Sequence, residues 1–528
     1  MYLLLSPVIL LLLAPLAMIA IRMARPSFAY TWLTGIFSSL LTLGILIWAG
    51  FQLPLSATLP IWANLKSVPA PSLLLDPVSW PFGIALVILN TTIILTSSVR
   101  SPTQLLSGNW KAWAATLILA GLGLFGVMAG EPLGLLMAWT AMDFIELFIW
   151  LLNINDNLER QRAVAVFGSR AVSSLLLLWG WISSGQTGVP FSFQALPANT
   201  ALFFLLAAGL RLGLFPLHLP FISGKDLRRG QGTMLKLAPT ASSIVLLIRI
   251  STVRFPAGLS PYLIVIAAII SLYGAIAWLI AKNELEGAPF WLLSLASMAL
   301  AATLTGQSAA SQAWGLSLLF SGGLLFLFSI RTQKLLVLPA LGLLVMSGLP
   351  LLPSSPTAEL YAHAGIFPAI LLLSAQALIL SGYIRHSLRP GQPLPVAERW
   401  MQVVYPFGLA LLPAGYILSA WVAKPGLHFP STLAGWAGGL LAVGLAAAFL
   451  IESPRLPGIS PETVSDIKQF FSFSWLFQSF SVGYRMVGTM ISWLTIILEG
   501  DGGVLWAFVV LALLLAMIAA GVGAGVGG

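Results

Sequence analysis

The sequence predicts an all-α, polytopic membrane protein with about sixteen transmembrane helices. Three observations predict this fold class. Hydrophobic residues make up 58% of the 528-residue chain and charged residues only 8%, whereas a soluble domain carries roughly 25% charge. Apolar runs of about 20 residues, the length that spans a hydrocarbon core, recur along the whole chain. The stretches between these runs are too short for a separate globular domain.

The composition also excludes several kinds of site. The chain contains no cysteine, which excludes disulfides and thiolate-held iron–sulfur clusters. Its four histidines, at positions 218, 363, 386 and 428, are scattered without the spacing of metal ligands. No glycine-rich phosphate-binding loop follows a strand. We therefore expect no cofactor. The net charge of +9 is explained by membrane topology and anionic lipid, so no nucleic-acid partner is expected.

Hydropathy predicts the helices in order along the chain. Their ranges are 2–21, 29–50, 78–97, 112–130, 132–152, 163–184, 199–219, 233–252, 260–281, 289–306, 311–330, 335–352, 364–384, 403–423, 431–451 and 503–521. We divide the chain into N-terminal helices (1–111), two five-helix repeats (112–252 and 260–385) and a C-terminal region (400–528). The last region contains an amphipathic lateral segment, 464–498, in which aromatic residues alternate with sparse charge, a pattern typical of an interfacial helix.

Basic residues are divided unequally between the loops, and this predicts the orientation of the chain. Loops after odd-numbered helices hold eighteen Lys and Arg residues, from Arg22 to Arg485, whereas loops after even-numbered helices hold three, Lys66, Arg254 and Lys424. Cytoplasmic loops carry an excess of positive charge. We therefore expect the odd loops in the cytoplasm and both termini on the extracytoplasmic side of the cell membrane.

Ionisable residues inside the predicted helices are the candidate functional residues, because such groups are costly in a membrane and usually face a cavity or a partner. The fifth helix carries Asp143 and Glu146, which are three residues apart and share a face. Arg170, Arg211 and Lys236 lie in the next three helices. One interpretation is that the paired carboxylates store or pass a proton. The alternative is that a salt bridge to Arg170 or Arg211 only joins helices.

Prolines interrupt the seventh and twelfth predicted helices. The seventh contains Pro216, two residues before His218; Pro350 and Pro353 break the twelfth and its continuation, and Glu359 follows. Irregular backbone at membrane depth is tolerated only against protein or a water-filled cavity. The two helices are five apart and therefore run in opposite directions, a pattern typical of inverted-repeat transporters. The alternative is that prolines are simply common in membrane helices.

The segment GLRLGLFPLHLPFISGKDLRRGQGTMLK resembles the helix 7–8 signature of the antiporter-like subunits of respiratory complex I, Mrp antiporters and membrane-bound hydrogenases. That family has a Lys five residues before a Pro-Leu-His/Gln motif and a second Lys or His twenty residues after the Pro. Arg211 and Lys236 occupy these two places. The segments AWTAMDF, FGSRAVSS and SGLPLLPSSPTAEL resemble the family's helices 5, 6 and 12. The sixteen-helix layout is similar to that of the largest complex I subunit.

This resemblance implies a proton-translocating, non-redox membrane subunit of a complex I-type NADH:quinone oxidoreductase or a related hydrogenase. Other membrane subunits and the lipid bilayer would be its partners, and protons or Na⁺ its cargo. The implied path comprises Asp143, Glu146, Arg170, Arg211, His218, Lys236 and Glu359. A standalone cation/proton antiporter and a non-pumping structural subunit remain open as alternatives.

The sequence departs from the family pattern at three places. The family's helix 5 Glu falls on Thr140, its helix 7 Lys on Arg211 and its helix 12 Lys on Ala358. Because arginine cannot release its proton in a protein, a relay that needs lysine there would be damaged. We expect Arg211 to pair with Asp143 or Glu146. Lys236 should point into the interior near the fifth helix, unless it snorkels to the headgroups.

Overall fold

The computed structural model describes most of the chain up to residue 452. The described residues are 2–26, 30–59, 71–98, 109–154, 156–185, 193, 198–214, 227–253, 255, 258–391, 399–422, 432–452 and the single positions 482, 486, 489 and 492. The chain divides into two compact units, Met1–Ile459 and Ser460–Gly528. Every element given below belongs to the first unit. The predicted last helix, 503–521, and nearly all of the predicted segment 464–498 lie outside the described residues.

The apolar runs fold into long helices in the predicted order. The elements are α1 (Tyr2–Ala24), α2 (Trp32–Gly50), β1 (Leu55–Thr58), β2 (Ser72–Leu75), α3 (Ser79–Ser98), α5 (Asn109–Val127), α6 (Pro132–Asn153), α7 (Asn157–Gly185), α8 (Ala198–Arg211), α9 (Arg229–Ile250), α10 (Ser260–Ile280), α11 (Glu284–Leu304), α12 (Ser308–Leu327), η1 (Gln333–Leu336), α13 (Val337–Met346), η2 (Ser355–Ala358), α14 (Glu359–His363), α15 (Ile366–Ser387), α16 (Arg399–Val422) and α17 (Leu433–Glu452). Within the described part of the chain, thirteen helices are long and apolar enough to cross a membrane. The all-α, polytopic fold class is confirmed.

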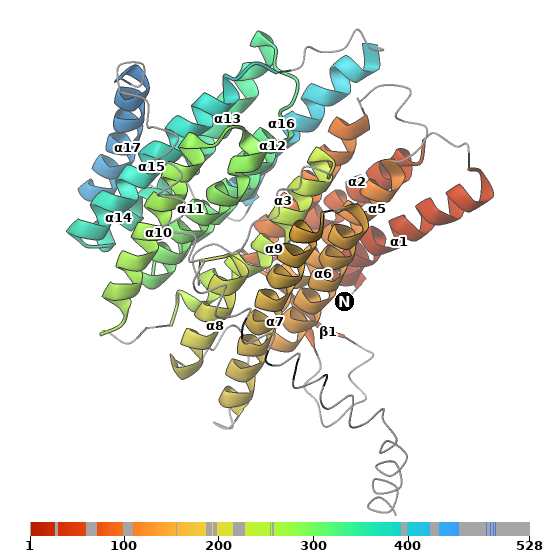
Figure 1. The fold of residues 1–528 in the computed structure, drawn as a ribbon, viewed down its shortest axis with the longest axis horizontal. Helices are drawn as coiled ribbons and strands as arrows, with labels where there is room; N and C mark the ends of the chain where they lie inside the picture. Colours follow the sequence, from red (N-terminus) through yellow and green to blue (C-terminus); the bar gives the residue numbers. More distant parts are fainter. Residues whose placement is uncertain are drawn as a thin grey trace, which may run out of the picture. The chain divides into compact units, whose positions relative to one another are not determined.

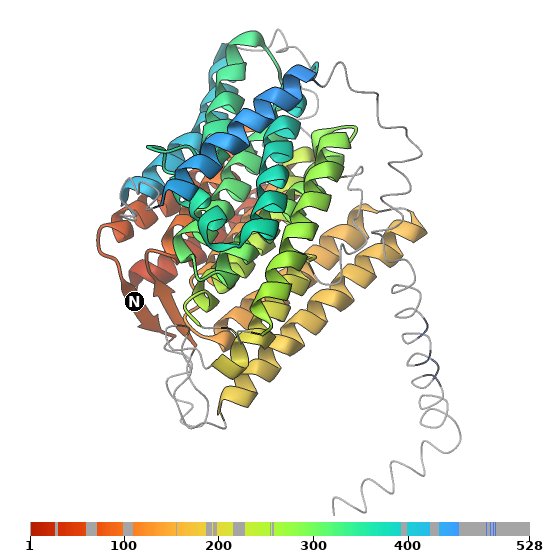
Figure 2. The same ribbon diagram turned by 90° about the vertical axis from the view of Figure 1, so that its left-hand side faces the viewer.

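The most buried helices, α3, α9, α11 and α12, lie in the middle of the bundle (Figure 1). Apart from a few charged side chains on α9 and α11, they are apolar or small on every face, and a helix of that kind is stable only when other helices surround it. By contrast, α7 and α17 leave most of their surface uncovered. Figure 2 shows α17 lying across α15 and the short helix α14, both of which it contacts.

The two predicted five-helix repeats pack in the same way. In the first set, α5 packs on α6 and on α9, and α6 packs on α7, which packs on α8. In the second set, α10 packs on α11 and on α15, and α11 packs on α12, which packs on α13. Five membrane crossings in each set, as predicted, would make the second set run in the opposite direction to the first. The matching contacts support an inverted repeat of this kind, which stays a prediction.

Each set contains one helix that ends early at a glycine. Helix α8 ends at Arg211, and Gly213 follows with a φ of +75°. The N–H groups of Gly213 and Leu214 bond back to the carbonyls of Leu210 and Gly209, which is the Schellman arrangement that terminates helices. Helix α13 ends at Met346, and Gly348 follows with a φ of +67°.

The interruption of the twelfth predicted helix is confirmed, because α13 stops before Pro350 and the chain resumes as η2 and α14. The freed carbonyls receive side-chain donors. Gln376 on α15 donates to the carbonyls of Met346 and Ser347, at 3.1 and 3.0 Å. Leu351 adopts a φ of +70° within this break. In the seventh predicted helix, Pro216 and His218 lie outside the described residues.

The loops separate into two groups at opposite ends of the bundle. At one end, residues at or after the ends of even-numbered predicted helices meet: Gly130 bonds to Ser72, and Phe193 bonds to Gly130. Gln312, in the first turns of α12, bonds there to Pro77. This end also holds a two-stranded antiparallel hairpin, β1–β2, which the sequence analysis did not predict. At the other end, residues that follow odd-numbered helices meet through their arginines, as described below.

Candidate functional site

Arg211 and Asp143 form a bidentate ion pair inside the bundle. The guanidinium Nη1 donates to Oδ2 at 2.8 Å and Nη2 to Oδ1 at 2.7 Å. The Arg211 side chain is fully buried and that of Asp143 is 5% exposed. The predicted pairing of Arg211 with a carboxylate of the fifth helix is thus confirmed. Two parallel N–H···O bonds are the strongest geometry that such a pair can adopt.

A second arginine completes a cluster of four charges. Arg170 on α7 forms an ion pair with Glu146, and its Nη1 lies 3.6 Å from Oδ1 of Asp143. Asp143, Glu146, Arg170 and Arg211, which we call the arginine–carboxylate cluster, carry two negative and two positive charges. The formal charges therefore cancel, as burial in a membrane demands. One carboxylate oxygen of Glu146 has no hydrogen-bond partner in the described structure.

Trp139 connects this cluster to α9. Its ring lies under the Arg211 guanidinium, with 4.6 Å between the guanidinium carbon and the ring centroid, which is a cation–π contact. Its indole N–H donates to the hydroxyl of Ser242 on α9 at 2.9 Å. The cluster therefore spans α6, α7 and α8 and reaches the central helix through one aromatic side chain.

Lys236 lies on α9 but turns toward the second five-helix set. Its ammonium donates to the carbonyl of Leu285 on α11, at 3.2 Å. The side chain is half-buried, and no salt bridge to it is found among the described residues. The sequence predicted an interior position for Lys236 near the fifth helix. Its hydrogen bond is made with α11, and its distance from the fifth helix stays a prediction.

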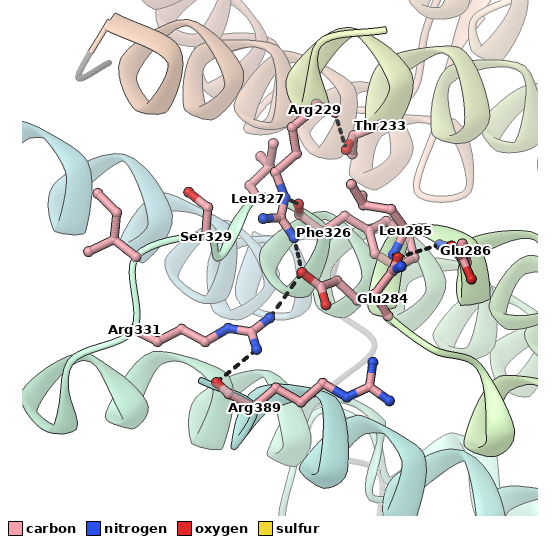
Figure 3. Close-up of polar contacts among 12 residues, drawn as sticks. Arg229, Thr233, Glu284, Leu285, Glu286, Phe326, Leu327, Ser329, Arg331 and Arg389 are labelled. Atoms are coloured by element: carbon pink, nitrogen blue, oxygen red, sulfur yellow. Dashed lines mark hydrogen bonds and ion pairs between the residues drawn. The ribbon is translucent and has the colours of Figure 1, made fainter. Parts of the chain in front are cut away.

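Glu284, which sequence reasoning did not single out, joins the two sets at the end where the odd-numbered loops meet (Figure 3). It forms ion pairs with Arg229, the first residue of α9, and with Arg331, which follows α12; the Arg331 Nη2 to Oε1 distance is 2.9 Å. Arg331 in turn donates to the carbonyl of Arg389, which follows α15. A signal was available, since Glu284 is an acid among the basic loops. Its partners are distant in sequence, so only the fold identifies them.

The opposite end of α9 is held in a similar way. Arg249 is buried, and its Nη1 lies 3.5 Å from a carboxylate oxygen of Asp76. Its guanidinium also lies 5.6 Å from the ring centroid of Phe193. Asp76 is fixed by the backbone N–H of Ser79, which donates to its carboxylate at 2.8 Å. Arg249 therefore makes a specific ion pair, in addition to lying near a helix end.

The remaining predicted site residues are placed as follows. Glu359 is the first residue of α14 and is half-buried, and its backbone carbonyl lies 3.0 Å from Nδ1 of His363. Ala358, where the resemblance implies a lysine, is fully buried. A Cβ on Gly439 of α17 would clash with the Gly348 carbonyl oxygen and lie 3.6 Å from the Ala358 Cβ, so α17 packs closely against this break. Predicted residue His218 lies outside the described structure.

Comparisons with known proteins identify the fold. No model of a known protein family matches the sequence, and no curated protein matches it. Solved structures do match. A chain of the Mrp complex from Dietzia sp. DQ12-45-1b aligns over 99% of this chain with a TM-score of 0.68 and 16% identity. The present chain spans 62% of the length of that chain.

Two further structures are similar over most of both chains. One is a chain of the membrane-bound sulfane sulfur reductase, an archaeal respiratory membrane complex, with a TM-score of 0.65, 15% identity, and coverage of 96% of this chain and 99% of that chain. The other is a chain of respiratory complex I from Thermus thermophilus, with a TM-score of 0.60, 19% identity, and coverage of 80% and 99%. At these sequence identities the structural similarity establishes the fold. It is the fold that the sequence motifs of the antiporter-like subunits implied.

Proposed function

We propose that the chain is an antiporter-like membrane subunit of a larger membrane complex of the complex I or hydrogenase type, and that Lys236 is its proton-carrying group. The three solved structures named above are chains of multi-subunit membrane assemblies, which supports the first part. Redox chemistry would belong to partner subunits, because this chain has no cysteine to hold an iron–sulfur cluster.

The observation that carries the second part is the difference between Lys236 and the arginines. A lysine ammonium can give up its proton, whereas a guanidinium in a protein cannot. Lys236 bonds to a neutral backbone carbonyl, while Arg211 is fixed by both oxygens of a carboxylate. Lys236 also lies on the central helix, at its contact with the second set. We infer that protons pass through Lys236 and that the arginine–carboxylate cluster acts as a fixed group of charges.

A second candidate is a structural subunit that no longer moves protons. The bidentate Arg211–Asp143 pair favours it, because the pair replaces a reversible lysine with a permanent charge. The full burial of Ala358 favours it as well, since the helix 12 position of the implied path has no ionisable side chain. A standalone antiporter is a third candidate, and it differs from the other two in having no partner subunits.

Isolation and reconstitution of the full chain test these functions together. The tagged chain is first purified from native membranes under mild detergent, and partner subunits are expected to copurify with it. Isolation of the chain alone would favour the standalone antiporter. The preparation is then reconstituted into vesicles that contain a pH-sensitive dye, and proton entry is measured under an imposed membrane potential.

Lys236→Ala is the informative variant, and Lys282→Ala is the matched control because Lys282 is exposed between α10 and α11. We expect Lys236→Ala to lower proton flux by about a hundredfold, the lower end of what a positioned proton-transfer group contributes. The Lys282 variant should keep the original rate. Equal flux in the two variants would favour the structural subunit.

A further inference from the structure

The hydrogen-bond acceptor of Lys236 has a cause in the sequence of α11. In an uninterrupted helix, the carbonyl of residue i accepts the N–H of residue i+4. The carbonyl of Leu285 would therefore accept from residue 289. Residue 289 is a proline inside α11, and proline has no N–H to donate. The Leu285 carbonyl is thus left without its helical donor, and it is this carbonyl that the Lys236 ammonium reaches, at 3.2 Å.

The first turn of α11 is held firmly in place opposite Lys236. The side chain of Asn283 accepts hydrogen bonds from the N–H groups of Leu285 and Glu286, at 3.1 and 2.9 Å, and so caps the helix. The neighbouring Glu284 is paired with Arg229. Arg229 and Lys236 are seven residues apart on α9 and share a face. Two contacts from one face of α9 therefore fix the same turn of α11.

A related arrangement occurs elsewhere in the chain with a neutral donor. Helix α13 ends at Met346, and the Gln376 amide of α15 donates to the free carbonyl of Met346 at 3.1 Å. A carbonyl without a helical donor is thus satisfied from a neighbouring helix in both places. The chemical difference lies in the donor, since an amide keeps its protons and an ammonium can release one.

We propose that Pro289 is a positioning residue for Lys236: by freeing the Leu285 carbonyl, it creates the acceptor that holds the ammonium at the α9–α11 contact. This proposal rests on the proposed role of Lys236 as the proton-carrying group. It assigns the location of that group to a residue 53 positions away in sequence, on the other five-helix set. Replacement of Pro289 by alanine would restore the N–H, which would compete with Lys236 for the same carbonyl.

The first test compares flux in reconstituted vesicles for Pro289→Ala and Pro413→Ala. Pro413 is a matched control because it is also a proline inside a long helix, α16, outside both sets. We expect Pro289→Ala to lower flux by about tenfold, because misplacement of a reacting group by about 1 Å is sufficient for a loss of this order. The Pro413 variant should keep most of its flux. Normal flux in Pro289→Ala, with flux lost in Lys236→Ala, would overturn the positioning role and leave the proposed function intact.

The second test is a stability cycle, which does not depend on proton flux. The thermal midpoint is measured for Pro289→Ala in the original chain and in a Lys236→Met background. Alanine is a better helix former than proline, and methionine is about as good a helix former as lysine. Neither substitution by itself should therefore prevent folding. We expect Pro289→Ala to raise the midpoint more in the Met background, where no lysine hydrogen bond is lost. Equal changes of the thermal midpoint in the two backgrounds would show that the Lys236–Leu285 hydrogen bond does not contribute to stability, and would overturn the inference. This result does not depend on whether Lys236→Ala alters proton flux.

Discussion

Arg211 holds both carboxylate oxygens of Asp143 at hydrogen-bond distance, 2.8 and 2.7 Å, from the last residue of α8. The pair links the end of an interrupted helix to the middle of α6. Gly213 turns the chain away immediately afterwards, and the carbonyls of the last helical turn accept backbone N–H groups. The guanidinium is therefore left to bind α6, where it also reaches the carbonyl of Trp139 at 3.4 Å.

Arg211→Ala should destabilise the protein strongly. The variant leaves Asp143 buried without its main counter-charge, and removal of one partner from a buried pair costs about 3–5 kcal/mol. The thermal midpoint in detergent, followed by tryptophan fluorescence, measures the loss. Arg162→Ala is the control, since Arg162 is 40% exposed and pairs with Glu159 on the same helix; surface pairs contribute about 0–1 kcal/mol. Similar midpoints for the two variants would contradict a structural role for the buried pair.

Arg211→Lys should raise proton flux. A lysine at this position keeps a positive charge beside Asp143 but can release its proton, so it adds a second proton-carrying base to the chain. Some stability should be lost, because an ammonium cannot reproduce the bidentate geometry. The vesicle assay described for Lys236 gives the rate. An unchanged or lower flux would indicate that the permanent charge of arginine does not limit conduction at this point.

Glu284→Gln should weaken the contact between the two five-helix sets. The substitution removes the negative charge that Arg229 and Arg331 share, and two partly buried guanidinium groups are then left to repel each other. We expect a fall in the thermal midpoint similar to that of Arg211→Ala. Glu286→Gln is the control, because that side chain lies in the same turn of α11 and is exposed. A midpoint no lower than the control's would contradict the role of Glu284 as the shared counter-charge.

The orientation of the chain can be tested with single cysteines, because the natural sequence contains none. Lys282→Cys lies at the end where the odd-numbered loops meet, and Gly258→Cys lies in an exposed even-numbered loop with open space around it. A membrane-impermeant thiol reagent added to sealed cells should label only the Gly258→Cys variant, following the distribution of positive charge. Labelling of the Lys282→Cys variant from outside would reverse the predicted topology. Gly230 is a poor site for this experiment, since a Cβ there would lie 2.6 Å from Ile93.

Much of the fold could be predicted because a bilayer limits the structures that can cross it. Apolar runs indicated the helices in order, and the prolines after Met346 indicated the break between α13 and α14. The pairing of Arg211 with α6 was predictable as well, since a buried guanidinium needs an anion. Which carboxylate it would choose was not, because Asp143 and Glu146 share a face and differ only in their height along the helix.

The contacts of Lys236 and Glu284 could not be predicted, for a different reason. Both depend on which face of α9 meets α11, and this follows from the packing of two sets that are far apart in sequence. Hydropathy describes each helix separately and contains no information on that contact. The hairpin β1–β2 was missed because its two strands have only four residues each and lie in a loop that an all-helical reading leaves unassigned.

The anchoring of α9 at both ends has a mechanical consequence. Arg229 is tied to Glu284 at one end and Arg249 to Asp76 at the other. Translation of this helix along its axis would break both ion pairs together, so such a movement of α9 is disfavoured. Pro239, near the middle of the helix, removes one backbone bond and provides a bending point. Any motion that alters the surroundings of Lys236 should therefore be a bending of α9 at its centre, with both ends of the helix held in place.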